Sequence, residues 1–196
     1  MRHARDAQPF GQADSPRGTG FCRLPQTLDR TQPPIVAIPA ELTAFWSQAL
    51  ASHPELDDAR FYEAFCFGDN ESLANELAEL VLRGQKQATA GLTWAFEAEN
   101  KPLPQPGDLS VVTNWARHPL CIIETTTVQV VPFDHVTEDF ARTEGEDDGT
   151  LSSWRRGHTA FFGRECARLG RTPSTDMPVV CETFRVVYQR RPSSAV

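Results

Sequence analysis

A lysine and a threonine lie three residues apart in a turn that follows a predicted helix. Lys86 comes just after Gly84, the residue expected to end that helix, and Thr89 follows it. An amine and a hydroxyl group this close in sequence are candidates for chemistry. The structural alternative is that the lysine binds the last carbonyls of the helix while the threonine stabilises the turn. The spacing alone leaves both interpretations open.

Two glutamates lie on apolar faces of predicted strands. Residues 120–131 and 179–188 are rich in β-branched side chains, and alternation places Glu124 and Glu182 among mostly apolar neighbours. A carboxylate in such a place is either paired in a structural salt bridge or part of a site. Because the pattern occurs on two strands, it favours one shared polar cavity.

A predicted helix over residues 150–169 also carries ionisable groups on its apolar side. Steps of 100° per residue place Arg155, His158 and Glu165 in the same sector as the apolar residues Leu151, Trp154, Phe161, Phe162 and Leu169. The structural interpretation is charge pairing for Arg155 and Glu165 and a hydrogen-bonded core position for His158. The functional one is that this helix forms the floor of a cleft, with Arg155 directed at an anion or a carbonyl.

The acidic run Glu144, Glu146, Asp147 and Asp148 precedes this helix. We expect a solvated loop whose negative charge complements the helix N-terminus, because carboxylates are stabilising there. The alternative is a divalent-metal site, since hard cations prefer carboxylate oxygens.

The periodicity of the chain positions these residues on helices and strands. We expect helices at 41–50, 54–65, 70–83, 90–100, 134–143 and 150–169, and strands at 109–113, 120–131 and 179–188. Helices followed by non-adjacent strands with further helices between them are typical of an α+β domain with a small curved sheet or barrel. The predicted organisation is a disordered extension at 1–36, one domain at 37–188 and a tail at 189–196.

Charge and composition exclude several classes of function. The chain has 196 residues and a net charge of −7; residues 1–36 carry +2 and Arg190 and Arg191 carry +2, which leaves −11 for 37–188. An acidic body disfavours binding to duplex DNA or long RNA. Five widely spaced cysteines without a CxxC pair fit a reducing cytoplasm, and no apolar run is long enough to cross a membrane. The sequence does not identify a protein partner.

The motifs together resemble the ASCH family. The resemblance is carried in order by FGD at 67–69, LAELVLRGQKQAT ending at Thr89, CIIETTTVQVVPF from Cys121, EGEDDGTLSSWRRGH from Glu144 and VVCETFRVVY from Val179. It implies a PUA-like fold, a small β-barrel flanked by helices, and a cleft associated with RNA or modified nucleosides. Within the family, two activities are described: amidohydrolysis of N4-acylated cytidine and cleavage of single-stranded RNA.

The amidohydrolase interpretation assigns catalysis to Lys86, Thr89 and Glu124, with no cofactor and no metal. Lys86 would be the base, Thr89 the nucleophile and Glu124 the group that orients them and moves a proton. Four further residues are expected to bind substrate, namely Phe67, Arg155, His158 and Glu182. The small amidohydrolase members lack the leading helices and the acidic loop, so the chain resembles more closely a longer bacterial branch of the family.

Two alternatives remain at this stage. A ribonuclease would use Lys86 and Arg155 to stabilise the phosphorane, with His158 or a glutamate as acid or base and a divalent cation as an optional helper. A non-catalytic RNA- or nucleotide-binding module would stack a base on Phe67, Trp94 or Trp154. We rank amidohydrolysis slightly above RNA cleavage, because a small modified nucleoside meets less repulsion from the acidic body than a long strand does.

Overall fold

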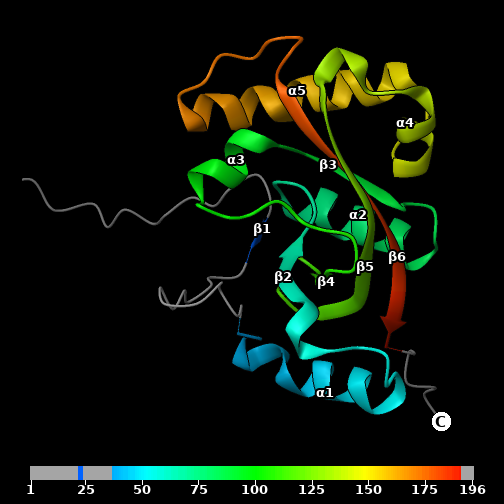
Figure 1. The fold of residues 1–196 in the computed structure, drawn as a ribbon. Helices are drawn as coiled ribbons and strands as arrows, with labels where there is room; N and C mark the ends of the chain where they lie inside the picture. The colour runs from blue at the N-terminus through cyan, green and yellow to red at the C-terminus, as the bar shows by residue number, and fades with distance from the viewer. Residues whose placement is uncertain (1–21, 24–36, 191–196) are drawn as a thin grey trace, which may run out of the picture.

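A curled mixed sheet forms the centre of the molecule (Figure 1). The structure is a computed structural model, and it describes residues 22–23 and 37–190. The strands lie in the order β1-β2-β4-β5-β6-β3, with every neighbouring pair antiparallel except β2 and β4. The two edge strands, β1 and β3, are not paired with each other, so the sheet is an open half-barrel. Its opening separates β3 from β1 and from the part of β2 that β1 does not reach. The strands are β1 (Cys22–Arg23), β2 (Phe61–Cys66), β3 (Ala88–Leu92), β4 (Leu109–Thr113), β5 (Pro119–Pro132) and β6 (Pro178–Gln189).

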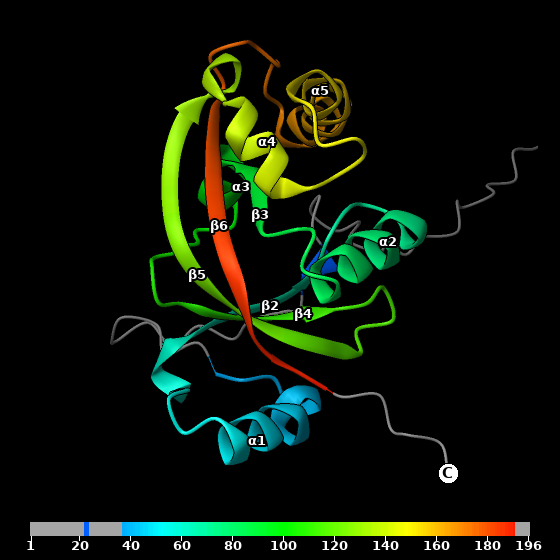
Figure 2. The ribbon, with the colours of Figure 1, turned by 90° about the vertical axis from the view of Figure 1, so that its right-hand side faces the viewer.

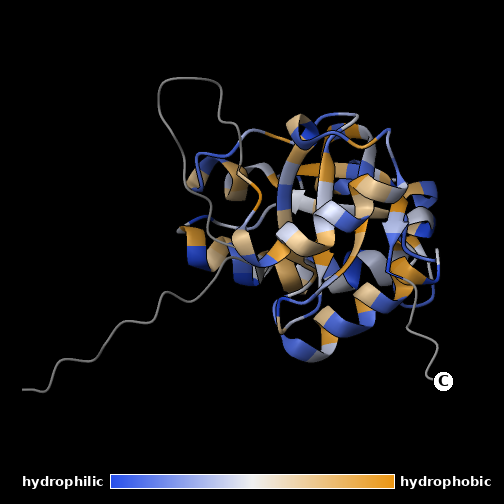
Figure 3. Cartoon of the chain, turned by 90° about the horizontal axis from the view of Figure 1, so that it is seen from below, coloured by the Kyte–Doolittle hydropathy of each residue, from blue (hydrophilic) through white to orange (hydrophobic). Residues whose placement is uncertain are grey.

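Helices cover the two ends of the long β5–β6 ribbon. Figure 2 shows α1 at one end of the ribbon and α4 and α5 at the other. The helices are α1 (Thr43–Ser52), α2 (Glu71–Leu82), α3 (Thr93–Ala98), α4 (Glu138–Glu144) and α5 (Leu151–Leu169), with 3-10 turns at Ala40–Leu42, Asp58–Arg60 and Phe133–His135. Hydrophilic and hydrophobic residues alternate along the helices, as expected for helices with one face on a core (Figure 3).

Side-chain caps explain where α2 and α5 begin. The side chain of Asn70 accepts a hydrogen bond from the backbone N–H of Leu73 and starts α2, and Thr150 does the same for Ser153 at the start of α5. Gly170 ends α5 in the left-handed conformation. None of the helices in the described part of the chain is long and apolar enough to cross a membrane.

The predicted α+β fold, a small curved sheet or barrel flanked by helices, is confirmed, and the sheet closes only as far as a half-barrel. The strands predicted at 109–113, 120–131 and 179–188 and the helix at 150–169 are present with nearly the same ends. The helix predicted at 54–65 is wrong, because this segment holds a 3-10 turn and then β2. All six residues of β2 are buried, so its sequence lacks the alternation that marks a strand with one wet face.

Two other predicted helices have different boundaries in the structure. The predicted helix at 90–100 begins only at Thr93, since the residues before it belong to β3. The predicted helix at 134–143 divides into a 3-10 turn at Phe133–His135 and α4.

The predicted N-terminal extension lies mostly outside the described residues. Its one described part, β1, pairs with Cys66 and Phe65 of β2, so a strand is present where disorder was expected. Of the predicted tail at 189–196, Gln189 belongs to β6 and residues 191–196 lie outside the described part. Cytoplasmic localisation stays a prediction.

The lysine turn (84–87) and the acidic turn (144–149) dock through their backbones. The N–H of Gln87 donates to the carbonyl of Thr143 at 3.0 Å. Gly145 ends α4 with φ at 67°, and a Cβ added there would lie 2.3 Å from the carbonyl oxygen of Gln85. Only glycine allows both this conformation and this close approach. Gly145 therefore sets how α4 meets the lysine turn.

We predict that Gly145→Ala destabilises the fold far more than Gly149→Ala. Both glycines have a positive φ, so both variants incur the left-handed penalty of about 1–2 kcal/mol. Only Gly145 also has backbone in the way, because nothing lies within 4 Å of the Cβ position at Gly149. Urea unfolding is expected to show an extra loss of about 2 kcal/mol or more for Gly145→Ala. Equal losses for the two variants would contradict this close packing.

Candidate functional site

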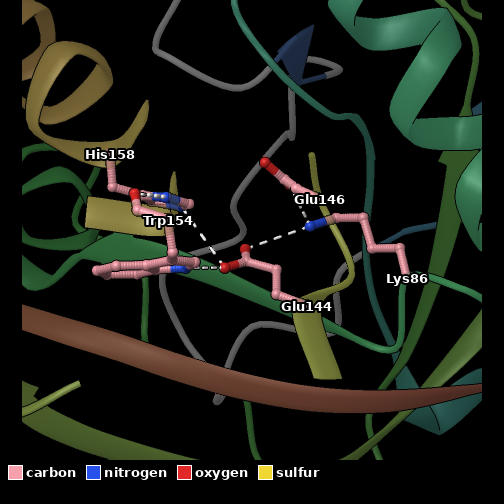
Figure 4. A network of polar contacts seen from close by, with 5 residues as sticks. All are labelled: Lys86, Glu144, Glu146, Trp154 and His158. Atoms are coloured by element: carbon pink, nitrogen blue, oxygen red, sulfur yellow. Dashed lines mark hydrogen bonds and ion pairs between the residues drawn. The ribbon is translucent and has the colours of Figure 1, made fainter. Parts of the chain in front are cut away.

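The carboxylate of Glu144 lies at the centre of a buried polar network (Figure 4). Its Oε1 is 3.2 Å from Nζ of Lys86. Its Oε2 accepts a hydrogen bond from the indole N–H of Trp154 and lies 3.6 Å from Nε2 of His158. The side chains of Glu144 and Lys86 are each 1% exposed. One carboxylate therefore joins the end of α4 to the lysine turn and to α5.

Lys86 has a second carboxylate partner. Its Nζ lies 2.5 Å from Oε1 of Glu146, and it also sits 5.1 Å from the centre of the Phe67 ring. Burial alone lowers the pKa of Lys86, but the charges of Glu144 and Glu146 outweigh it and leave this pKa above its ordinary value. Lys86 is therefore held as an ammonium group. The predicted role of Lys86 as a base requires the neutral amine, which these two carboxylates oppose.

His158 is fixed by partners on both ring nitrogens. Nδ1 lies 3.1 Å from the backbone carbonyl of Trp154, which only accepts, so this nitrogen carries a proton. The imidazole stacks on the indole of Trp154 with ring centres 4.0 Å apart, while Nε2 faces Glu144. Burial lowers the pKa of His158, yet the Glu144 carboxylate raises it to a net value above the ordinary one. This geometry favours the doubly protonated ring.

Glu144 remains ionised despite its burial. Burial raises the pKa of Glu144, but Lys86 and His158 oppose this and bring it down to about 2. The sequence-based expectation of a solvated acidic loop is therefore wrong for this residue. It is confirmed for the end of the run, because Asp148 accepts from the N–H of Thr150 at 3.0 Å, next to the start of α5. In the described part of the chain, no group of three His, Cys, Asp or Glu side chains is placed to hold a metal ion.

Thr89 and Glu182 lie together at a different place. They are direct partners on β3 and β6, and with Glu63 of β2 they line a small cavity at the opening of the half-barrel. Thr89 points away from its neighbours Ala88 and Ala90, since successive residues of a strand face opposite sides. The hydroxyl of Thr125 donates to Oε1 of Glu182 at 2.6 Å and so orients this carboxylate.

The cavity is narrow and acidic. Its volume of about 20 Å³ holds a single water molecule or an amino group. Glu63 contacts Nζ of Lys101 at 2.6 Å, and that ammonium lies over the ring of Tyr62 at 4.2 Å. The residues that line the cavity are Glu63, Phe65, Thr89, Ala90, Gly91, Phe96, Val180 and Glu182, so none of them is cationic.

Glu124 belongs to neither of these places. Its carboxylate lies 2.5 Å from Nη2 of Arg60 and 2.5 Å from Nη2 of Arg185. Burial raises the pKa of Glu124, and its hydrogen bonds to the two arginines lower it to a net value below the ordinary one. The sequence groups Glu124 with Lys86 and Thr89, whereas its charged partners in the structure are the two arginines.

The other residues predicted to bind substrate do not come together at one site either. Arg155 is on the exposed side of α5 and donates to the backbone carbonyl of Asp134 at 2.8 Å. Phe67 is 1% exposed and packs on Phe65, so the predicted stacking of this ring on a base is not available. Trp154 is buried in the network around Glu144, which removes it as a stacking platform in the same way.

Sequence reasoning missed Glu144 and Glu63. Glu144 belongs to a charged run that is typical of a solvated loop, and Glu63 belongs to the segment wrongly predicted as a helix. The available signal was the lysine itself, because a buried ammonium requires a carboxylate partner.

Comparisons with known proteins agree with this geometry. The family model for the ASCH domain matches residues 63–188. The chain is similar to an ASCH domain structure from Lactobacillus crispatus JV V101, with 39% identity and a TM-score of 0.72 over 78% of this chain and 98% of that one. A protein from Enterococcus faecalis V583 shares 32% identity and a TM-score of 0.67 over 75% of this chain and 88% of that one. Among curated proteins, the comparison finds no match.

We predict that Glu144→Gln strongly destabilises the protein. It leaves the buried Lys86 ammonium with only one carboxylate, and breaking a buried ion pair costs about 3–5 kcal/mol. Glu146→Gln is the matched control and is expected to cost less, because Glu146 is 25% exposed. Urea unfolding measures both, and adding Lys86→Met to Glu144→Gln is expected to recover part of the loss. An unchanged free energy of unfolding in Glu144→Gln would show that the network contributes little to stability.

We also predict that His158 titrates above its ordinary pKa of 6.5. The stability that follows from this raised pKa is fully present below pH 6.5 and is lost as the pH rises through the folded-state value. NMR titration of the imidazole, assigned with a His158→Gln variant, measures the pKa directly. In Glu146→Gln this pKa is expected to fall, since one negative charge near the ring is lost. A wild-type value at or below 6.5 would contradict the geometry.

Proposed function

Because the chain belongs to the ASCH domain family, which is associated with RNA binding, we propose that it binds a nucleoside or a short single strand at the half-barrel opening and hydrolyses N4-acylated cytidine there. The observation that carries this proposal is the pairing of Thr89 with Glu182 in one cavity between β3 and β2. In this proposal the Thr89 hydroxyl is the nucleophile, and the Glu182 carboxylate, which accepts a hydrogen bond from Thr125, is the base.

The cavity chemistry suits the amino edge of a cytosine. Carboxylates accept hydrogen bonds from the N4 amino group of this base, and Glu182 and Glu63 both line the cavity. Cytosine, unlike a phosphate, brings no negative charge to these carboxylates. The cavity in its present form admits a single small group. We propose that entry of a base widens it by separating β2 from β3, which share no ladder hydrogen bonds.

The proposed reaction uses Thr89 as the nucleophile and Glu182 as the base. The Thr89 oxygen attacks the acyl carbonyl while its proton passes to Glu182, which returns the proton to N4 as the C–N bond breaks. Water then hydrolyses the acyl-threonine ester and releases the free acid. Lys86, as a locked ammonium, serves here by fixing the lead-in to β3, and Glu124 takes no part in the chemistry.

A ribonuclease finds less support in the site. Its transition state gathers negative charge on a phosphorane, which requires a nearby cation. The cavity has no cationic lining residue, and Lys86 is covered by Glu144 and Glu146. Arg155 lies on the exposed side of α5 with a backbone partner. The two cations that the ribonuclease hypothesis joins therefore have separate partners.

We predict that Thr89→Val and Glu182→Gln each reduce release of cytidine from N4-acetylcytidine by at least about 100-fold, because each removes one member of the nucleophile and base pair. Thr127→Val is the matched control, since Thr127 is exposed and bonded to Thr183. Chromatography of the products measures the rate. Wild-type protein that binds the nucleoside without turnover would make it a binding module. Cleavage of single-stranded RNA without amide hydrolysis would support the ribonuclease instead.

A further inference from the structure

A second concave site lies around Glu124. It has a volume of about 340 Å³ and is lined by Glu55, Leu56, Arg60, Glu124, Arg185, Val186 and Val187. None of these residues lines the cavity of Thr89 and Glu182. We propose that it is an anion site that takes a phosphate group, with Arg60 and Arg185 as the ligands and Glu124 as the residue that positions them.

Glu124 draws together two guanidinium groups from different elements. Arg60 comes from the 3-10 turn before β2, while Arg185 lies directly opposite Glu124 on β6. Nη2 of Arg60 donates to Oε1, and Nε of Arg185 donates to Oε2 at 2.7 Å. The carboxylate uses one oxygen for each arginine and so holds both at one edge of the site.

Backbone carbonyls complete the orientation of Arg60. Its Nε donates to the carbonyl of Gly107 at 2.7 Å and its Nη1 to the carbonyl of Glu55 at 3.4 Å. The Arg60 side chain is thereby held from three directions and is only 31% exposed. An arginine fixed in this way loses little further freedom when a ligand binds.

Arg60 and Arg185 have more N–H donors than their partners within the protein accept. A guanidinium has five N–H donors, and the contacts to Glu124, Gly107 and Glu55 occupy only some of those that Arg60 and Arg185 provide. A phosphate has several oxygens and accepts from two forks at once, which is the geometry that arginine recognises best. The volume of about 340 Å³ is in the range of small-molecule sites.

Charge and lining agree with a phosphate-bearing ligand. The lining holds two guanidinium groups and two carboxylates, so its formal charge is zero on a body whose net charge is strongly negative; Arg60 and Arg185 form the cationic edge against Glu124. Leu56, Val186 and Val187 supply apolar lining beside that edge. Glu55 is exposed and also lines the site, so its carboxylate opposes an incoming anion. Phosphate affinity should therefore fall when an arginine is removed and rise when the Glu55 charge is removed.

Arg185→Gln is expected to weaken binding of inorganic phosphate at least about tenfold, because it removes one of the two forks. Glu55→Gln is expected to strengthen it, since a repelling charge is lost. Arg142→Gln is the matched control, an exposed arginine that pairs with Asp139 on α4. Isothermal calorimetry on the full chain measures each affinity, with thermal unfolding as the check on folding.

A second arm uses cytidine 5′-monophosphate and separates this site from the half-barrel opening. Loss of its binding in Arg185→Gln, with no loss in Thr89→Val, supports the anion site. The reverse pattern locates the nucleotide at the opening and overturns the proposal. No saturable phosphate binding by the wild type, or equal affinities for Arg185→Gln and Arg142→Gln, would overturn it as well.

Discussion

The rest of the structure depends on one buried carboxylate. Removing an ionised side chain from water costs several kcal/mol, and only partners that approach from several sides offset it. Glu144 obtains an ammonium from the turn after α2 and an indole and an imidazole from α5. Because the requirement is mutual, none of these segments keeps its place without the others. The same contacts bring α4 and α5 against the lead-in to β3, where Gly145 allows the backbones to touch.

This constraint also decides what Lys86 does. A buried lysine becomes a base when desolvation dominates, and it stays an ammonium when carboxylates dominate. Here two carboxylates surround it and favour the ammonium form. Its position in the motif indicates a base, whereas its proton state indicates a structural cation. A fixed ammonium holds the start of β3, and β3 carries Thr89 to its place opposite Glu182. In the proposed function, the lysine therefore has a positioning role through the backbone and no chemical role.

The sequence was most informative where one face of an element is wet. The strand at 179–188 and the helix at 150–169 follow from periodicity. The strand at 109–113 is fully buried, and it is indicated instead by its β-branched residues directly after the Pro-Gly-Asp loop. Periodicity fails for β2, whose residues are all buried. It also cannot pair charges across long separations: Lys86 and Glu144 are 58 positions apart, and Arg60 and Glu124 are 64 apart. Which carboxylate meets which cation is set by the curl of the sheet, so grouping Glu124 with Lys86 could not be tested from spacing.

The uneven pairing of charges is consistent with the nucleoside ligand that we propose for this acidic protein. The opening presents carboxylates with no cationic lining residue, which suits a neutral base and opposes a phosphodiester. The site around Glu124 presents two arginines gathered by one carboxylate, which suits a phosphate. A net charge of −7 over the whole chain therefore says little about either site. Each cation's partners decide what it can still bind: Lys86 is fully enclosed, whereas Arg185 remains 68% exposed and keeps donors to offer.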